Sequence, residues 1–237
     1  MKQINSGGMR SEKSSASSGP GRVVVIEDQR LVAEYLARQC AELGLRVLQV
    51  CPGFESGLAA VRELVPSLVL LDISLPDGDG LELARLALKE FPRIKILAVS
   101  SHCDPWTMLQ VQRLQLQGFV DKHGQRPEVL ADAIRAVLGG QTYYTPIVNE
   151  SSTTIRRDPK AFIRVLSDYE TRILGLIGES QSDDEIAQVL DISPATVQSR
   201  RRDIMRKLAI HSTPKLIHYA IVNGLTRAEQ LGRARPT

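Results

Sequence analysis

The chain has 237 residues, of which 43% are hydrophobic, and its formal net charge is +3. This length exceeds that of one typical domain and the apolar content can fill ordinary cores, so we expect two modest domains, with one large domain as the alternative. No apolar run approaches the roughly 18 residues of a membrane span, and the three cysteines lack the even count and spacing of a disulfide framework or a zinc site. We therefore expect a cytoplasmic protein without a membrane partner.

Charge is distributed unevenly along the chain. Between Arg22 and Arg135 there are 13 Lys and Arg residues against 15 Asp and Glu residues. From Pro194 to the end, nine basic residues face only two acidic ones. An acidic-leaning front and a basic end indicate that the two parts of the chain have different partners.

Short apolar runs alternate with helical patterns in the first part of the chain. Residues 1–21 are rich in Ser and Gly, and we expect a flexible tail there. Short, largely β-branched runs predict strands at 22–26, 46–50, 67–72, 95–100 and 118–121. Helices are predicted at 31–43, 54–64, 80–90, 105–116 and 127–138. This alternation predicts an α/β domain over residues 22–140, a doubly wound parallel sheet with helices on both faces.

The pattern changes after this domain. Residues 141–160 include Pro, Ser and Thr without a sustained period, and we expect a linker. From 161 to 237 the pattern is purely helical, with helices predicted at 167–177, 182–190, 194–208 and 213–223. Ser182 and Glu185 form a capping-box pattern at the start of one of them. An all-α C-terminal domain of four helices is therefore expected.

Polar side chains stand at the ends of four predicted strands. Glu27 and Asp28 follow the first strand, Asp72 and Ser100 end the third and fourth, and Lys122 follows the fifth. Because parallel strands end at one edge of the sheet, we expect these side chains to converge. Carboxylates about 4 Å apart repel by roughly 4 kcal/mol per pair at an effective dielectric near 20. The cluster needs a cation, and hard oxygen ligands favour Mg²⁺.

Asp72 taken alone could cap a turn, bind a metal or act as a nucleophile. Beside Mg²⁺, the Lys122 ammonium and the Ser100 hydroxyl, its carboxylate is suited to accept a phosphoryl group. The two other acids of the same stretch, Asp77 and Asp79, are expected to belong to the PDGDG turn and to the cap of the following helix.

These residues and the DISLP segment at Asp72 resemble the receiver domain of bacterial two-component response regulators, over roughly residues 21 to 140. The resemblance implies a flavodoxin-like (βα)5 fold in which Asp72 is the phosphoacceptor. It also implies that Asp28 and Asp72 supply carboxylate ligands to Mg²⁺ with the backbone carbonyl of Ser74, while Glu27 assists through water.

The resemblance further implies a switch pair, in which the Ser100 hydroxyl moves to the phosphoryl oxygen and the Phe119 ring turns inward. The chain departs from the commoner pattern twice, with Glu27 where Asp is commoner and Phe119 where Tyr is frequent. Neither change removes a required group, so we expect a competent pocket.

The basic end of the chain has the proportions of a helix-turn-helix. Residues 182–190 are predicted to form a short capped helix, followed by a tight DIS turn and a second helix at 194–208, with a buried stripe at Ile192, Val197, Ile204 and Leu208. The opposite side of a helix of this shape fits the major groove. A membrane-surface or partner-binding helix is the alternative for so basic a segment.

This segment resembles the LuxR-type helix-turn-helix of NarL/FixJ regulators over about 60 residues, through EIAQVLDIS, ATV and RRDIMRKL. The resemblance implies base contacts from Gln198, Ser199 and Arg202. Phosphate contacts are implied for four further residues, which are Thr196, Arg200, Arg206 and Lys207. Gln198 stands where the family often has lysine and can contact adenine through two hydrogen bonds, so the target sequence is expected to differ.

Together the two resemblances imply a transcription regulator and not an enzyme. Its implied partners are a sensor histidine kinase, double-stranded DNA and a second copy of the chain in the active state, with RNA polymerase as a further one to consider. Two alternatives stay open. One is a DNA-binding regulator whose receiver is a phosphorylation-independent dimerisation module, and the other is an Mg²⁺-dependent aspartyl phosphohydrolase. The latter needs a carboxylate two residues after Asp72, where Ser74 stands.

Overall fold

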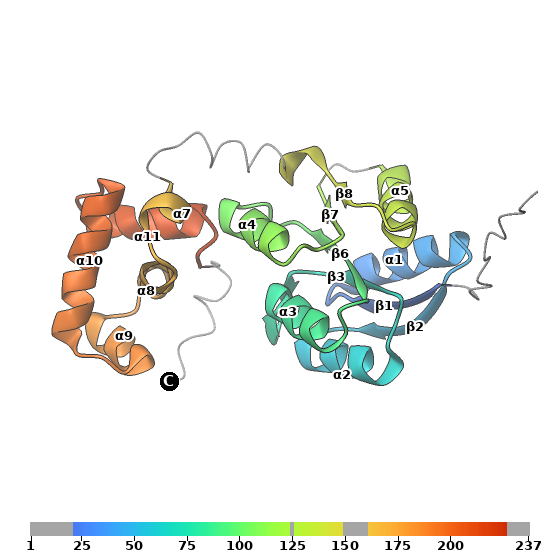
Figure 1. Cartoon of the computed structure of the whole chain (residues 1–237), viewed down its shortest axis with the longest axis horizontal. Helices are drawn as coiled ribbons and strands as arrows, with labels where there is room; N and C mark the ends of the chain where they lie inside the picture. The colour runs from blue at the N-terminus through green and yellow to red at the C-terminus, as the bar shows by residue number, and fades with distance from the viewer. Residues whose placement is uncertain (1–20, 124–125, 149–160, 227–237) are drawn as a thin grey trace, which may run out of the picture.

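The computed structural model describes residues 21–123, 126–148 and 161–226 (Figure 1). A six-stranded parallel sheet dominates the first part, in the order β2-β1-β3-β6-β7-β8. Its strands are β1 (Arg22–Ile26), β2 (Arg46–Cys51), β3 (Leu68–Leu71), β6 (Lys95–Ser100), β7 (Gly118–Asp121) and β8 (Tyr143–Tyr144). A small antiparallel pair, β4 (Ser74–Leu75) and β5 (Gly78–Asp79), follows β3.

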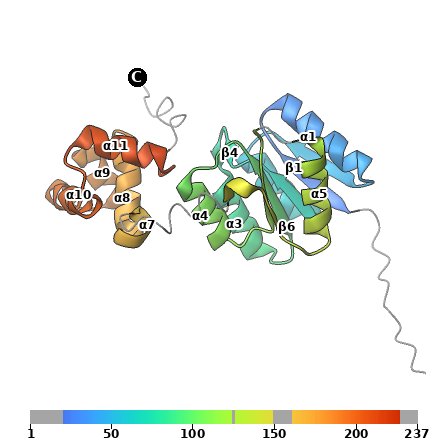
Figure 2. The ribbon, with the colours of Figure 1, turned by 90° about the horizontal axis from the view of Figure 1, so that it is seen from above.

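Helices cover both faces of this sheet (Figure 2). One face carries α1 (Arg30–Glu42) and α5 (Pro127–Leu138), and the other carries α2 (Phe54–Leu64), α3 (Gly80–Glu90) and α4 (Pro105–Arg113). Alternate residues of β1 enter the two apolar cores, Val23 on the α1 side and Val24 on the α2 side. Because both faces of the central strands are buried, β3 is wholly apolar and β1 is apolar after Arg22, as their sequences predicted, whereas the edge strand β2 is partly exposed.

In the described residues 161–226, the C-terminal domain is built from five helices (Figure 1). They are α7 (Phe162–Val165), α8 (Asp168–Gly178), α9 (Asp183–Leu190), α10 (Pro194–Leu208) and α11 (Thr213–Val222). Capping boxes start α8 at Ser167 and α9 at Ser182, so the second of these confirms the sequence prediction. The domain has its own core, in which Ile186, Val197 and Ile204 are fully or almost fully buried.

The predicted α/β and all-α architecture is confirmed, and the differences are local. The fourth helix of the sheet domain ends at Arg113 and not at residue 116, since Gln115 adopts a left-handed conformation with φ 52°. The short strand β8 lies in the segment predicted as a linker and extends the sheet beyond five strands. The sequence also did not indicate α7 or the β4–β5 pair. The tail expected at residues 1–21 and most of the linker lie outside the described residues.

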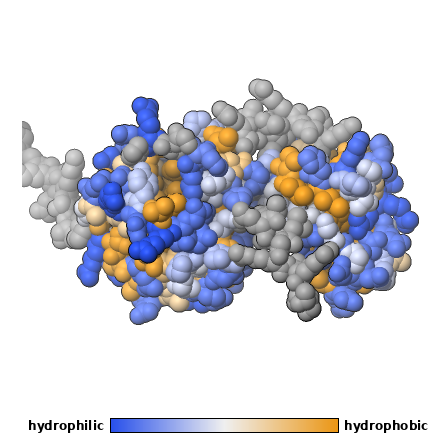
Figure 3. Space-filling model, turned by 180° about the vertical axis from the view of Figure 1, so that it is seen from behind, coloured by the Kyte–Doolittle hydropathy of each residue, from blue (hydrophilic) through white to orange (hydrophobic). Residues whose placement is uncertain are grey.

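The distribution of hydrophobic residues on the surface is consistent with two separate apolar cores. On the face shown in Figure 3, hydrophilic residues cover most of both domains and hydrophobic residues gather in smaller patches. Among the helices that the structure describes, none has both the length and the apolar character to cross a membrane.

Candidate functional site

The carboxyl ends of the parallel strands position the acidic residues. The Asp72 amide donates to the Ile26 carbonyl at 2.9 Å, and the Glu27 amide donates to the Cys51 carbonyl at 2.9 Å. These bonds continue the sheet ladder by one residue beyond β3 and β1. The side chains of Glu27, Asp28 and Asp72 therefore reach the same edge, as the strand order predicted.

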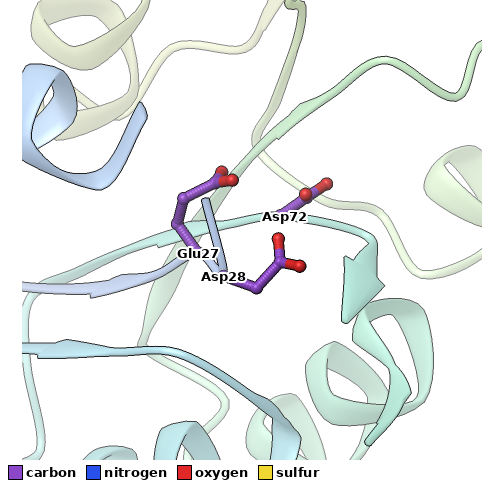
Figure 4. Close-up of side chains that lie close together, drawn as sticks. All are labelled: Glu27, Asp28 and Asp72. Carbon is purple, nitrogen blue, oxygen red and sulfur yellow. The ribbon is translucent and has the colours of Figure 1, made fainter. Parts of the chain in front are cut away.

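Three carboxylates gather at this edge (Figure 4). One carboxylate oxygen each from Glu27, Asp28 and Asp72 lies within 4.8 Å of the others. Glu27 and Asp72 are buried, whereas Asp28 is exposed. An all-oxygen donor set with one side open to water fits Mg²⁺, which usually keeps several of its waters. These residues therefore fit the metal that the sequence implied.

Lys122 bridges the two buried carboxylates. Its Nζ lies 2.7 Å from Oε2 of Glu27 and 2.8 Å from Oδ2 of Asp72. Burial acts to lower the pKa of Lys122, but hydrogen bonds and charge from Asp72 and Glu27 outweigh it and raise that pKa. Burial raises the pKa of Glu27, against the opposing effect of Lys122. The cluster thus holds a charged lysine beside Asp72 and a glutamate that is costly to ionise.

The residues implied as a switch lie beside this cluster. Ser100 is fully buried at the end of β6, where its carbonyl accepts from the Lys122 amide at 3.0 Å and its Oγ accepts from the His102 amide at 3.3 Å. Phe119 is fully buried in β7, and the Ser74 amide donates to Oδ1 of Asp72 at 3.2 Å. All five residues predicted to converge are thus at one edge, while the roles assigned to them stay predictions.

Asp77 and Asp79 each cap a helix. Asp79 accepts from the Leu81 amide at 2.8 Å and caps the following helix α3, as predicted. Asp77 instead accepts from the Phe54 and Glu55 amides, at 2.6 and 3.2 Å, so it caps the remote helix α2. The cap residue of α2 is Gly53, and a Cβ there would overlap the Asp77 carboxylate. The missing side chain at Gly53 was the sequence signal for a cap supplied from elsewhere.

A glycine also permits the turn after Asp72. The Gly80 amide donates to the Ile73 carbonyl at 2.9 Å, and a Cβ on Gly80 would overlap the Asp72 carbonyl oxygen. Any larger residue at this position would therefore push α3 away from the end of β3.

The second candidate site is the outer face of α10. Val197, Ile204 and Leu208 are buried, and Ile192 is packed at the edge of the same core, as the stripe predicted. All seven residues implied in DNA contact are exposed, namely Thr196, Gln198, Ser199, Arg200, Arg202, Arg206 and Lys207. Two of them have acidic partners, since Arg206 contacts Asp203 at 2.8 Å and Lys207 contacts Glu170 at 2.7 Å.

One contact between the two domains was not foreseen. Trp106, near the start of α4, places its ring 6.0 Å from that of Phe162 in α7. Its amide donates to the Asn223 carbonyl, after α11, at 3.0 Å. Arg113 at the end of α4 lies 3.5 Å from Asp168 at the start of α8. Helix α4, which follows the Ser100 loop, thus contacts the C-terminal domain at three points.

Comparison with known proteins matches each part of the chain to a protein family. Residues 23–135 match the response regulator receiver domain, and residues 164–220 match the bacterial regulatory proteins of the luxR family. The response regulator UvrY of Escherichia coli K12 is 29% identical over 88% of this chain and 97% of its own. The response regulator GacA of Pseudomonas viridiflava is 32% identical over 87% of this chain and 98% of its own.

A solved structure shares the fold. The chain of RcsB from Salmonella enterica serovar Typhimurium, bound to the promoter rprA with the phosphomimetic BeF3−, matches with a TM-score of 0.62. The match covers 84% of this chain and 98% of that one, at 22% sequence identity.

Proposed function

The chain belongs to the NarL/FixJ family of two-component response regulators, which regulate transcription through a LuxR-type DNA-binding domain, and on this premise we propose that phosphorylation of Asp72 controls its binding to DNA. The observation that carries the proposal is the contact of 2.8 Å between Asp72 and Lys122 within the three-carboxylate cluster. A buried carboxylate with a fixed cation beside it is what acceptance of a phosphoryl group requires.

The proposed reaction moves a phosphoryl group from a histidine of a sensor kinase to Asp72. A bond forms between an Asp72 carboxylate oxygen and phosphorus while the P–N bond to the imidazole breaks, and its electron pair returns to that nitrogen. The Lys122 ammonium stabilises the charge on the transferred oxygens, and the Ser100 hydroxyl donates a hydrogen bond to one of them. Asp28, Asp72 and the Ser74 carbonyl would hold Mg²⁺, with Glu27 assisting through water. When bound, the metal offsets further negative charge on the phosphoryl oxygens.

The proposed output is sequence-specific binding by α10. Its exposed face would enter the major groove, with Gln198, Ser199 and Arg202 at base edges. Thr196, Arg200, Arg206 and Lys207 would contact phosphates. We infer that two copies bind together in the active state. The protein would act in the cytoplasm, where DNA and the catalytic part of a sensor kinase are both present.

The contact of α4 with the C-terminal domain supports a link between the two sites. Ser100 ends β6, and Trp106 stands in the first turn of the helix that follows. A shift of the Ser100 loop when Asp72 is phosphorylated would move Trp106 relative to Phe162 and Asn223. The phosphorylated receiver would then populate a second arrangement of the domains with a different DNA affinity.

Intact-mass measurement tests the phosphorylation step. Acetyl phosphate with Mg²⁺ should add one phosphoryl group to the wild-type chain and none to Asp72→Ala. Asp77→Asn is the matched control, because it removes a carboxylate that caps α2 from the same turn, and it should be labelled like the wild type. Equal labelling of Asp72→Ala and the wild type would mean that another residue is the acceptor.

A further inference from the structure

One arginine of α10 differs from its neighbours. Arg201 keeps only 15% of its side chain exposed, and both its Nε and Nη2 contact Oδ1 of Asp183, at 3.0 and 2.5 Å. Asp183 is the first residue of α9 and has 25% of its side chain exposed. The neighbouring Arg200 and Arg202 are exposed. Arg201 therefore joins the middle of α10 to the start of α9.

Of the other acidic contacts of α10, that of Lys207 with Glu170 joins it to α8, whereas that of Arg206 with Asp203 joins no second element. Arg206 and Asp203 are three residues apart in α10, and the Arg206 side chain is largely exposed. Such a pair fixes nothing beyond its own helix and contributes little. The Arg201–Asp183 pair in contrast spans two helices and is partly shielded from water. Its hydrogen bonds are directional, whereas the apolar packing of Val197 and Ile204 beneath α10 is not.

The pair also changes which charges face DNA. Asp183 lies at the N-terminus of α9, where an unpaired carboxylate would repel nearby phosphates. The Arg201 guanidinium neutralises that carboxylate. Because it is bound to Asp183, it does not add to the positive charge that faces DNA. The basic face available to DNA then consists of the exposed residues on either side of Arg201.

We propose that Arg201 and Asp183 are positioning residues for DNA recognition, which set the orientation of α10 relative to α9 and contact neither bases nor phosphates. The inference rests on the proposed insertion of α10 into the major groove. The alternative is that Arg201 leaves Asp183 in the complex and binds a phosphate. The two possibilities predict opposite changes in DNA affinity for Asp183→Asn. Neutralising an acidic residue near DNA raises affinity unless that residue has a positioning role.

The test measures the affinity of the full-length protein for two duplexes over a series of salt concentrations. One duplex is selected by the wild-type protein from a random pool, and the other is a scrambled version of it. We expect Asp183→Asn and Arg201→Gln each to lower the ratio of selected to scrambled affinity about tenfold, the size of one lost base contact. The slope of log affinity against log salt should stay that of the wild type, since no phosphate contact is lost.

Rescue distinguishes positioning from general damage to the fold. The exchange variant Asp183→Arg with Arg201→Asp keeps the net charge and the pairing, and it should recover most of the lost ratio. Asp203→Asn is the matched control, because it breaks an ion pair confined to α10 and should leave the ratio unchanged. Thermal unfolding of each variant shows whether it is folded. If Asp183→Asn or Arg201→Gln is unfolded, the affinity ratio of the exchange variant alone decides whether the pair has a positioning role.

Two outcomes would overturn the inference while leaving the proposed function intact. One is tighter binding of Asp183→Asn to both duplexes with a steeper salt slope, together with a slope for Arg201→Gln that is shallower by about 0.9. The other is an exchange variant that folds but does not regain the selected ratio. If the wild type selects no sequence, or if Arg202→Gln binds both duplexes like the wild type, the proposed role of α10 itself fails.

Discussion

Among the residues that the structure describes, each domain has one buried glutamate paired with a lysine, and the two pairs differ in kind. Glu27 and Lys122 are 0% and 12% exposed, and Lys122 is shared with Asp72. Glu170 and Lys207 are 7% and 38% exposed, and Glu170 also accepts hydrogen bonds from the Ser167 amide and hydroxyl. Glu27 shares its lysine with a second buried carboxylate and otherwise accepts only a long hydrogen bond from the Gln29 amide, at 3.3 Å, whereas Glu170 has its lysine to itself and three shorter bonds to one of its oxygens.

Their pKa values show this difference. Burial raises the pKa of Glu27 in spite of Lys122. Burial acts in the same direction on Glu170, but hydrogen bonds from Lys207 and Ser167 outweigh it and lower the pKa of that carboxyl. A carboxylate cluster that the protein leaves short of cations is suited to bind a metal and a phosphoryl group. A fully satisfied carboxylate is suited to hold α8 and α10 together.

The largest difference between the two pairs is expected in the free energy of unfolding when each lysine is replaced. Lys122→Gln leaves two buried carboxylates without a cation, and we expect it to lower the free energy of unfolding by about 3 kcal/mol without Mg²⁺. Lys207→Gln should cost less than about 1 kcal/mol, because water reaches that site. Urea unfolding at neutral pH measures both values, and equal losses would contradict the comparison.

Replacing the glutamates should give effects of opposite sign. Glu170→Gln removes the carboxylate that accepts from the Ser167 amide and pairs with Lys207, so it should destabilise the chain by about 1 kcal/mol. Glu27→Gln removes a charge that is costly to bury and should leave stability unchanged or raise it in the absence of metal. Urea unfolding in the presence of a chelator measures both, and a destabilised Glu27→Gln protein would count against the account.

The two glutamates should also respond oppositely to pH. Because the folded-state pKa of Glu27 is raised above 4.5, its favourable contribution is complete below pH 4.5 and is lost as pH rises through the folded value. Because that of Glu170 is lowered, its contribution is present above pH 4.5 and is lost as pH falls through the folded value. The stability difference between the wild type and each Gln variant, followed across this range, should slope downward with rising pH for Glu27 and upward for Glu170. Parallel slopes would show that the sites do not differ.

The smallest expected effect concerns the contact that joins the two domains. Trp106→Ala removes the ring contact with Phe162, so the change in DNA affinity caused by phosphorylation should shrink about fivefold. Arg113→Gln is a milder control, since its partner Asp168 is highly exposed. Trp106 is the only tryptophan of the chain, and its fluorescence should change when acetyl phosphate and Mg²⁺ are added. If phosphorylation changes the DNA affinity of Trp106→Ala as much as that of the wild type, the contact with Phe162 has no part in regulation.

The sequence predicted those features that repeat a local pattern or follow from strand order. Apolar runs gave five of the strands, and the rule that parallel strands end at one edge brought Asp72 together with Lys122 although they lie far apart in the chain. The capping box at Ser182 could be recognised for a similar reason, since it involves only neighbouring residues.

Contacts between remote segments could not be predicted where strand order does not determine them. Asp77 caps the remote helix α2, because folding brings the loop after β3 beside Gly53. Lys207 and Arg201 look alike as basic helix residues, and only the fold shows that Glu170 and Asp183 lie beside them. Trp106 is an ordinary apolar residue in the sequence, and its contact with Phe162 depends on how the domains meet.

The most direct test of the account compares the affinity of the wild-type protein and of Asp72→Ala for the selected duplex, with and without acetyl phosphate and Mg²⁺. We expect the phosphodonor to tighten binding of the wild type about tenfold and to leave Asp72→Ala unchanged. Equal affinity of the wild type in both conditions, with its phosphorylation verified by mass, would contradict control of DNA binding by Asp72 and would favour a receiver that serves only for dimerisation.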